Sequence, residues 1–179
     1  MSILFYLLSI VTANVVTAAV MPFHLGALII PAGSLIVGLT FILRDYVQKQ
    51  HGRAKTYAII SFALMLSALS SYLLGDTLII VLASAIAFLV SETTDTEIYS
   101  RLKLPFSMRV LYSGLVGGFL DSVLFVIIGL SPLGAGFLTW EMVPLAILGQ
   151  ILAKFLLQGL GVIVIKGIEK KTLNQPSSV

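Results

Sequence analysis

The sequence contains no cysteine, and charged residues make up only 11% of its 179 positions. The missing cysteines exclude disulfide bonds, thiolate zinc sites and cysteine nucleophiles. An ordinary soluble domain is about 25% charged and about 45–50% apolar. This chain is 58% hydrophobic, with a mean hydropathy of +1.06. We therefore expect an integral membrane protein, and not a soluble enzyme, a nucleic-acid-binding protein or a disordered chain.

Sequence motifs of common enzymes are also missing. The chain has no GxSxG elbow, no HExxH pair and no Walker loop. With two histidines and no cysteine, it offers few ligands for a transition metal. We expect no enzymatic activity, no cofactor and no metal site, and no means of powering transport directly with ATP.

The long apolar runs predict the fold. A bilayer core about 30 Å thick needs roughly 20 apolar residues in each helix. Six such runs predict an all-α polytopic membrane protein, a bundle of six transmembrane helices. It would form a single domain over residues 1–171, with a short flexible tail over residues 172–179. The spans are expected at residues 2–21, 26–44, 56–75, 77–98, 109–130 and 141–165.

The positive charges predict the orientation of these spans. Ten of the eleven Lys and Arg residues lie between spans two and three, between spans four and five, or after span six. Cytoplasmic loops carry an excess of Lys and Arg, so both termini are expected in the cytoplasm. The exception is Lys154, which lies inside span six.

The second span is unusual at both ends. It contains Pro31-Ala32-Gly33, which either breaks a membrane helix, as in many transporter sites, or lies in the first turn of a shorter helix. At its other end, Arg44 and Asp45 are a candidate ion pair or coupling pair, or only a pair that closes a helix end.

Polar residues interrupt four of the spans. A charged side chain at mid-bilayer costs at least about 2.5–3.5 kcal/mol, so it normally faces other helices and has a partner. Gln150, Lys154 and Gln158 recur every four residues and share one face of the last span. The remaining such residues are Asn14 in span one, Glu92 and Asp95 in span four, and Asp121 in span five. We expect Asp121 and Lys154 to face each other or to share one polar cavity.

These residues also have purely structural explanations. Lys154 could be only a counter-ion for Asp121, and Asn14 could only join helices. Glu92 and Asp95 could be solvated near the cytoplasmic boundary. The sequence leaves these alternatives open.

Three stretches together carry a resemblance to a known family. They are Pro31-Ala32-Gly33 with residues 41–54, residues 83–95 with Tyr99 and Arg101, and residues 113–125 with Ser113-Gly114 and Asp121-Ser122. In this order and spacing the chain, over about residues 10–165, resembles the queuosine precursor transporters, also called the VUT or vitamin-uptake-type family. Many relatives have a D-x-x-x-E-x-x-G run. Here Lys49 stands in place of the glutamate, which argues against a coupling role for that loop.

The resemblance implies a bacterial inner-membrane protein that imports a 7-deazaguanine, such as 7-cyano-7-deazaguanine, for tRNA modification. The expected partners are the lipid bilayer and this small molecule, without nucleic acid. A transporter of another metabolite, such as a vitamin, is the alternative. The sequence does not separate a carrier that acts alone from a homo-oligomer or from a subunit with an energising module.

The polar residues suit a guanine-like ring. A carboxylate can accept from its N1–H and exocyclic amine, amides or an amine can donate to O6, and aromatic faces can stack on the ring. We therefore expect a substrate site in spans one, four, five and six, with Glu92 as acceptor and Asp95 as its helper or gate. If transport is proton-coupled, Asp121 is the best candidate carboxylate, provided that Lys154 is not its permanent partner. The predicted substrate-binding residues are Asn14, Phe88, Glu92, Asp95, Asp121, Gln150 and Lys154.

Overall fold

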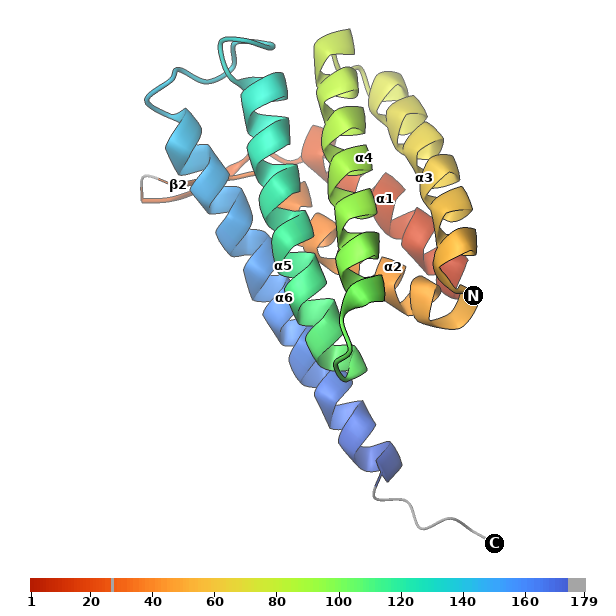
Figure 1. Cartoon of the computed structure of the whole chain (residues 1–179). Coiled ribbons are helices and arrows are strands. Elements are labelled where there is room, and N and C mark those ends of the chain that lie inside the picture. The colour runs from red at the N-terminus through yellow and green to blue at the C-terminus, as the bar shows by residue number, and fades with distance from the viewer. Residues whose placement is uncertain (27, 174–179) are drawn as a thin grey trace, which may run out of the picture.

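The structure is a computed structural model that describes residues 1–26 and 28–173 (Figure 1). These residues form six α-helices, one π-helical segment and a hairpin of two short strands. The elements are α1 (Ser2–Ala19), β1 (Phe23–Leu25), β2 (Leu28–Ile30), α2 (Gly33–His51), α3 (Arg53–Leu73), α4 (Leu78–Arg101), α5 (Phe106–Leu124), η1 (Phe125–Leu130) and α6 (Val143–Leu173).

Successive helices run in opposite directions, so the connections gather at two ends of the bundle (Figure 1). We call one the hairpin end, because it holds the β1–β2 hairpin and the connections at residues 74–77 and 131–142. The other, the basic end, holds the α2–α3 and α4–α5 connections and the end of α6. The Ser2 hydroxyl donates to Gln50 Oε1 at 2.6 Å, which places the start of α1 at the basic end as well.

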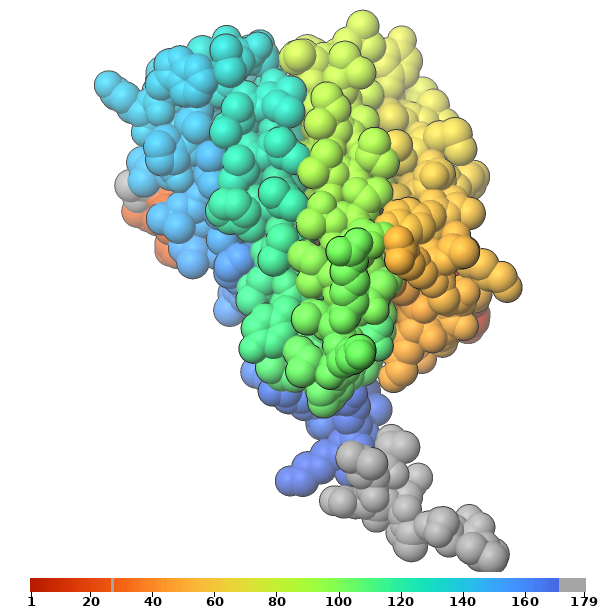
Figure 2. Space-filling view, viewed as in Figure 1, coloured from red at the N-terminus to blue at the C-terminus, as the bar shows by residue number. Residues whose placement is uncertain are grey.

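Five helices of the described part are long and apolar enough to cross a membrane: α1, α3, α4, α6, and α5 together with η1. Large apolar side chains on their outer faces are exposed, as expected of surfaces that meet lipid; examples are Leu4, Phe62, Leu82, Phe119 and Leu156. On the face seen in Figure 2, α3, α4 and α5 lie side by side, and α6 continues past them at the basic end. The chain is thus a multi-pass membrane protein.

The sixth helix, α2, is different in position and in polarity. It contacts each of the other five α-helices, so it lies at the centre of the bundle. Its second half carries Arg44, Asp45 and Gln48, all of them buried. Polar side chains are tolerated on this face of α2 because it meets neighbouring helices and not lipid.

The bounds expected for the second span, residues 26–44, are wrong, because α2 covers Gly33–His51. Its first part forms strand β2, which pairs antiparallel with β1 in the register His24 with Ile29, so the fold is not purely helical. Gly26 takes a φ of +60°, a left-handed conformation that suits the hairpin turn. The helix begins only at Gly33, and the Pro31 carbonyl accepts a hydrogen bond from Ser34 N. Pro31 thus stands at the start of a shorter helix and does not break a longer one.

The other predicted spans match helices with small shifts at their ends. The main departures are in the last two. The fifth span ends in the π-helix η1, and α6 runs to Leu173, two residues into the stretch expected to be a tail. The rest of that stretch, residues 174–179, lies outside the described residues.

Close packing fixes α6 against its neighbours. A Cβ atom at Gly149 would lie 2.5 Å from the Ile29 carbonyl oxygen, so only glycine lets α6 approach β2 this closely. At Gly38 of α2, a Cβ atom would lie 3.1 Å from the Lys154 carbonyl oxygen. These contacts bring the polar face of α6 toward the bundle axis.

Candidate functional site

A cavity of about 370 Å³ lies inside the bundle. Side chains of all six α-helices and of η1 line it, and its wall reaches from Lys154 and Glu92 to Pro22, Asp76 and Phe137 at the hairpin end. Ligand pockets typically measure about 300–1,000 Å³ and combine apolar walls with a few placed polar groups. This cavity fits that description, and it extends toward the hairpin end.

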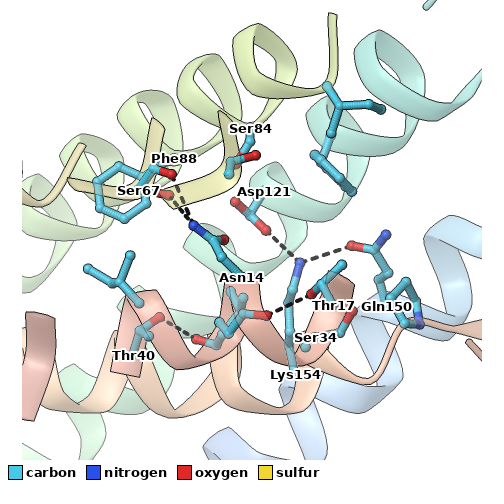
Figure 3. A pocket seen from close by; sticks show the side chains of 18 of the residues that line it. Asn14, Thr17, Ser34, Thr40, Ser67, Ser84, Phe88, Asp121, Gln150 and Lys154 are labelled. Carbon is cyan, nitrogen blue, oxygen red and sulfur yellow. Dashed lines mark hydrogen bonds and ion pairs between the residues drawn. The ribbon is translucent and has the colours of Figure 1, made fainter. Parts of the chain in front are cut away.

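Lys154 of α6 is the central cation of the cavity wall. Its ammonium group donates to Asp121 Oδ2 at 2.6 Å, to Ser122 Oγ at 2.8 Å and to Gln150 Oε1 at 3.3 Å. An ammonium has three protons, so these three acceptors satisfy it completely. Figure 3 shows Lys154 reaching Asp121, with Gln150 beside it. The structure thus brings Asp121 and Lys154 together as an ion pair, with Lys154 2% exposed.

The side-chain amide of Gln150 has a hydrogen-bond donor that is not used within the described residues. Its side chain is 2% exposed and lines the cavity, and its oxygen accepts from Lys154. Its Nε2 atom is buried and makes no hydrogen bond within the described residues. A buried amide donor without a partner costs about 1–3 kcal/mol, so a ligand that accepts from it would recover this energy.

Asn14 of α1 lines another part of the wall and is held in place by α3. Its Nδ2 donates to Ser70 Oγ at 2.7 Å, to the Ser67 carbonyl at 3.0 Å and to Ser67 Oγ at 3.2 Å. Figure 3 shows this contact between Asn14 and Ser67. Asn14 therefore joins two helices and also borders the cavity, so its structural role does not remove it from the cavity wall.

Aromatic rings supply flat apolar surface to the same cavity. Phe41, Phe88 and Phe125 line it from α2, α4 and η1. Phe125 opens the π-helical turn one helical turn after Asp121. π-helical turns are rare and are frequently found at functional sites.

A second polar cluster lies next to the cavity and surrounds Arg44. We call it the Arg44 cluster; it consists of Arg44, Asp45, Glu92 and Asp95. The guanidinium forms ion pairs with Asp45 Oδ1 at 3.2 Å, with Glu92 Oε2 at 3.1 Å and with Asp95 Oδ2. No member is more than 1% exposed. Glu92 and Asp95 are thus buried, which rules out the alternative that they are solvated.

Hydrogen bonds tie the Arg44 cluster to α4 and α5. Arg44 Nη1 donates to Gln48 Oε1 and to Thr96 Oγ1, each at 3.0 Å. Gln48 Nε2 donates to Ser100 Oγ at 2.8 Å. Ser113 of α5 donates to Asp45 Oδ2 at 3.3 Å. Arg44 and Asp45 are therefore part of the packed interior, and the expectation that Arg44 belongs to a connection between spans is wrong.

Glu92 belongs to both groups of residues. It pairs with Arg44 through Oε2, and it lines the cavity together with Asp121 and Lys154. The Tyr6 hydroxyl of α1 lies beside its carboxylate. Asp45 and Asp95 are not among the residues that line the cavity. Glu92 is therefore the member of the cluster that meets the cavity.

The structure brings most of the predicted site residues to one place. Six of the seven line the cavity, namely Asn14, Phe88, Glu92, Asp121, Gln150 and Lys154; Asp95 lies behind Glu92 in the Arg44 cluster. Gln158, on the same face of α6 as Lys154, instead donates to the Val110 carbonyl at 2.6 Å.

Sequence reasoning missed several residues of the wall. Ser34 and Thr40 come from α2, and Ser67 and Ser71 come from α3. Small hydroxyl residues are common in membrane helices, so their presence alone did not mark a site. The run of Ser67, Ser70 and Ser71 on one helix would have been a usable signal. No group of three or more His, Asp or Glu residues in the described part is arranged to hold a metal ion.

Residues 70–167 match a protein-family model described as "Putative vitamin uptake transporter". The matched region holds α4, α5, η1 and most of α6, and so includes Glu92, Asp121, Gln150 and Lys154. No curated protein and no solved structure matches the chain.

Proposed function

The chain belongs to the family of vitamin uptake transporters, and we propose that its substrate is a 7-deazaguanine precursor of queuosine, such as 7-cyano-7-deazaguanine. The protein would bind this molecule in the cavity and release it into the cytoplasm for tRNA modification. We further propose that it resides in a bacterial inner membrane, crosses it six times, and has both termini in the cytoplasm.

The observation that supports this substrate most strongly is that one cavity is lined by both an amide donor that is left unpaired and a carboxylate. Gln150 Nε2 has no hydrogen-bond partner among residues 1–26 and 28–173, and Glu92 pairs with Arg44 through one of its two oxygens. A guanine-like edge offers an acceptor, O6, next to the donors N1–H and the exocyclic amine. We assign O6 to Gln150 and the two donors to Glu92.

The remaining walls suit the rest of the ring. Because Lys154 is already paired with Asp121, this part of the cavity presents no net charge to a substrate. A neutral bicyclic ring would lose less hydration than an ion on entering it. Phe88 and Phe125 line the cavity as well and could stack on the faces of the ring.

The family description favours a second candidate, a vitamin or a similar small metabolite. The cavity volume and its aromatic walls would accommodate a heterocyclic vitamin equally well. The two candidates differ in whether the site recognises the guanine-like edge of the ring, with its O6, N1–H and exocyclic amine. A site built to hydrogen-bond a group rejects an analogue without that group by a large factor, whereas an apolar pocket discriminates weakly.

A cell test separates these candidates. We would express the chain in a bacterium that can neither make the 7-deazaguanine precursor nor import it, and feed the precursor at low concentration. Restored queuosine in tRNA is the expected result. Gln150→Leu should lower uptake at limiting precursor, because O6 loses its donor. The matched control is Gln50→Leu, which changes an exposed glutamine at the basic end.

Competition identifies the recognised edge. Guanine-like compounds should inhibit uptake by the wild-type chain, and the analogue without the exocyclic amine should inhibit much more weakly. Equal inhibition by both analogues, or restoration of queuosine that does not depend on this chain, would contradict the proposal. Inhibition by a vitamin alone would favour the second candidate.

A further inference from the structure

The interior of the bundle contains more negative than positive groups. In the part of the chain that the structure describes, four carboxylates lie there against two cations: those of Asp45, Glu92, Asp95 and Asp121 against Arg44 and Lys154. Lys154 and Asp121 balance each other. The Arg44 cluster is then left with three carboxylates around one guanidinium, all of them buried. Uncompensated charge in such surroundings is strongly unfavourable.

The simplest compensation is a proton on one carboxylate. The described residues hold no arrangement of acidic groups suited to a metal ion. A proton needs no such arrangement, because it forms a covalent bond with a single carboxylate oxygen. Protonation would turn one acid of the cluster into a neutral hydrogen-bond donor.

Glu92 is the member of the cluster that a proton from the cavity can reach. It lines the cavity, whereas Asp45 and Asp95 lie behind it and are fully buried. Asp95 also has an ion pair with Arg44, and Asp45 accepts from Ser113 as well as pairing with Arg44. Asp121, the candidate expected from the sequence, is less suited because Lys154 holds it at 2.6 Å.

Tyr6 provides an independent indication. Its hydroxyl is fully buried beside the Glu92 carboxylate, yet it makes no hydrogen bond of ordinary geometry within the described residues. A hydroxyl both donates and accepts. Tyr6 can therefore donate to an ionised Glu92 and accept from a protonated one, so it serves both states of the acid.

We propose that Glu92 binds the proton that couples this transporter to a proton gradient, an inference that rests on the proposed transport function. On the cavity side, Glu92 takes up a proton and its ion pair with Arg44 weakens. When Glu92 pairs with Arg44 again, the proton leaves toward the basic end. One proton enters and one leaves in each cycle, and no bond other than O–H changes.

The groups that face Glu92 fit this role. They are Tyr6 from α1, Arg44 and Asp45 from α2, Asp95 from α4 itself, and Asp121 from α5, which Lys154 of α6 neutralises. Arg44 favours the ionised acid, while the neighbouring carboxylates favour the protonated acid. The balance between the ionised and the protonated form of Glu92 therefore changes with the Arg44–Glu92 distance. This distance depends on how α2 and α4 pack. Proton binding is thereby linked to helix movement.

Transport in liposomes tests the coupling. The purified full chain would be reconstituted, and labelled 7-cyano-7-deazaguanine followed in two assays: exchange without a gradient, and accumulation with an acidic exterior. We expect wild type to show both. Glu92→Gln, which mimics the protonated acid, should lose accumulation. Because Glu92 also accepts from the substrate, exchange should weaken as well, and the exchange that remains at raised substrate concentration should no longer change with pH. The proposal would be overturned if accumulation by wild type did not depend on the proton gradient. It would also be overturned if Glu92→Gln accumulated the substrate as wild type does.

A measurement without substrate separates this proposal from the proposed function. Infrared difference spectra between acidic and alkaline buffer report the carbonyl stretch of protonated carboxylic acids. The wild-type band should lose intensity in Glu92→Gln and keep it in the double variant Asp121→Asn/Lys154→Gln, which removes that ion pair without stranding a charge. If Glu92→Gln loses the band but the wild-type protein does not exchange 7-cyano-7-deazaguanine, the proton-binding role of Glu92 is supported and the proposed substrate is wrong. An unchanged band in Glu92→Gln would overturn the role of Glu92. If that variant does not fold, Glu92→Asp should shift the band instead.

Discussion

Arg44 Nε lies 3.1 Å from Glu92 Oε2, and this contact joins the Arg44 cluster to the cavity. Arg44 belongs to α2 and Glu92 to α4, so the two helices cannot separate at this level without separating the charges. The cavity extends from this contact toward the hairpin end. The Arg44 cluster thus bounds the cavity on the side away from that end.

Replacing Arg44 should destabilise the protein strongly. Arg44→Ala would leave three buried carboxylates without their cation, and breaking a buried ion pair costs about 3–5 kcal/mol. Thermal unfolding in detergent would measure the loss. Lys49→Ala is the matched control, because Lys49 is exposed on the same helix and contacts only the Phe106 ring among the contacts described here. Equal melting temperatures for the two variants would contradict this expectation.

The Asp121–Lys154 pair should show strong non-additivity. Asp121→Asn strands a buried ammonium, and Lys154→Gln strands a carboxylate, whereas the double variant strands neither. Each single variant should therefore lose more stability than the double variant. A double-mutant cycle on unfolding in detergent would provide the coupling energy. If both single variants are as stable as wild type, the pair contributes nothing.

The distribution of Lys and Arg predicts which end of the bundle faces the cytoplasm. The chain has no cysteine, so single cysteines can be introduced without background. Thr139→Cys, exposed at the hairpin end, should react with an impermeant thiol reagent in intact cells. Gln50→Cys, exposed at the basic end, should react only after the membrane is opened. The reverse pattern would invert the proposed topology.

Two glycines of α6 should respond oppositely to the same substitution. Gly149→Ala would place a methyl group 2.5 Å from the Ile29 carbonyl oxygen and force α6 away from β2. In Gly159→Ala the added methyl group meets no atom of another helix within 4 Å. Replacing glycine by alanine in a helix restricts the unfolded chain, which typically stabilises the folded state by about 0.4–1 kcal/mol. We expect a lower melting temperature for Gly149→Ala and an equal or higher one for Gly159→Ala. Two equal shifts would mean that the α6–β2 contact is not tight.

Much of this arrangement could be predicted from the sequence, because membrane helices must satisfy simple rules. Apolar length located five of the helices, and the cost of a mid-membrane charge identified Lys154 as a residue that needs a partner. The spacing of Gln150 and Lys154 placed both side chains on one face of α6, and both line the cavity.

The rest depended on packing between distant segments, which spacing along the chain does not encode. The apolar residues Leu28, Ile29 and Ile30 suit a buried strand as well as a membrane helix, so the hairpin was missed. Arg44 looked like a boundary residue because it is charged. Only its contacts with Asp95 and Glu92, about fifty positions later, show that it is interior.

The central position of α2 has a consequence for how the protein is made. A segment that carries Arg44, Asp45 and Lys49 would partition poorly from the translocation machinery into lipid by itself. Its partners on α4 and α5, Glu92, Asp95 and Ser113, are synthesised later. We therefore expect α2 to remain next to α1, shielded from lipid, until α4 and α5 have been synthesised. Insertion and folding of the protein would then depend on the charges around Arg44.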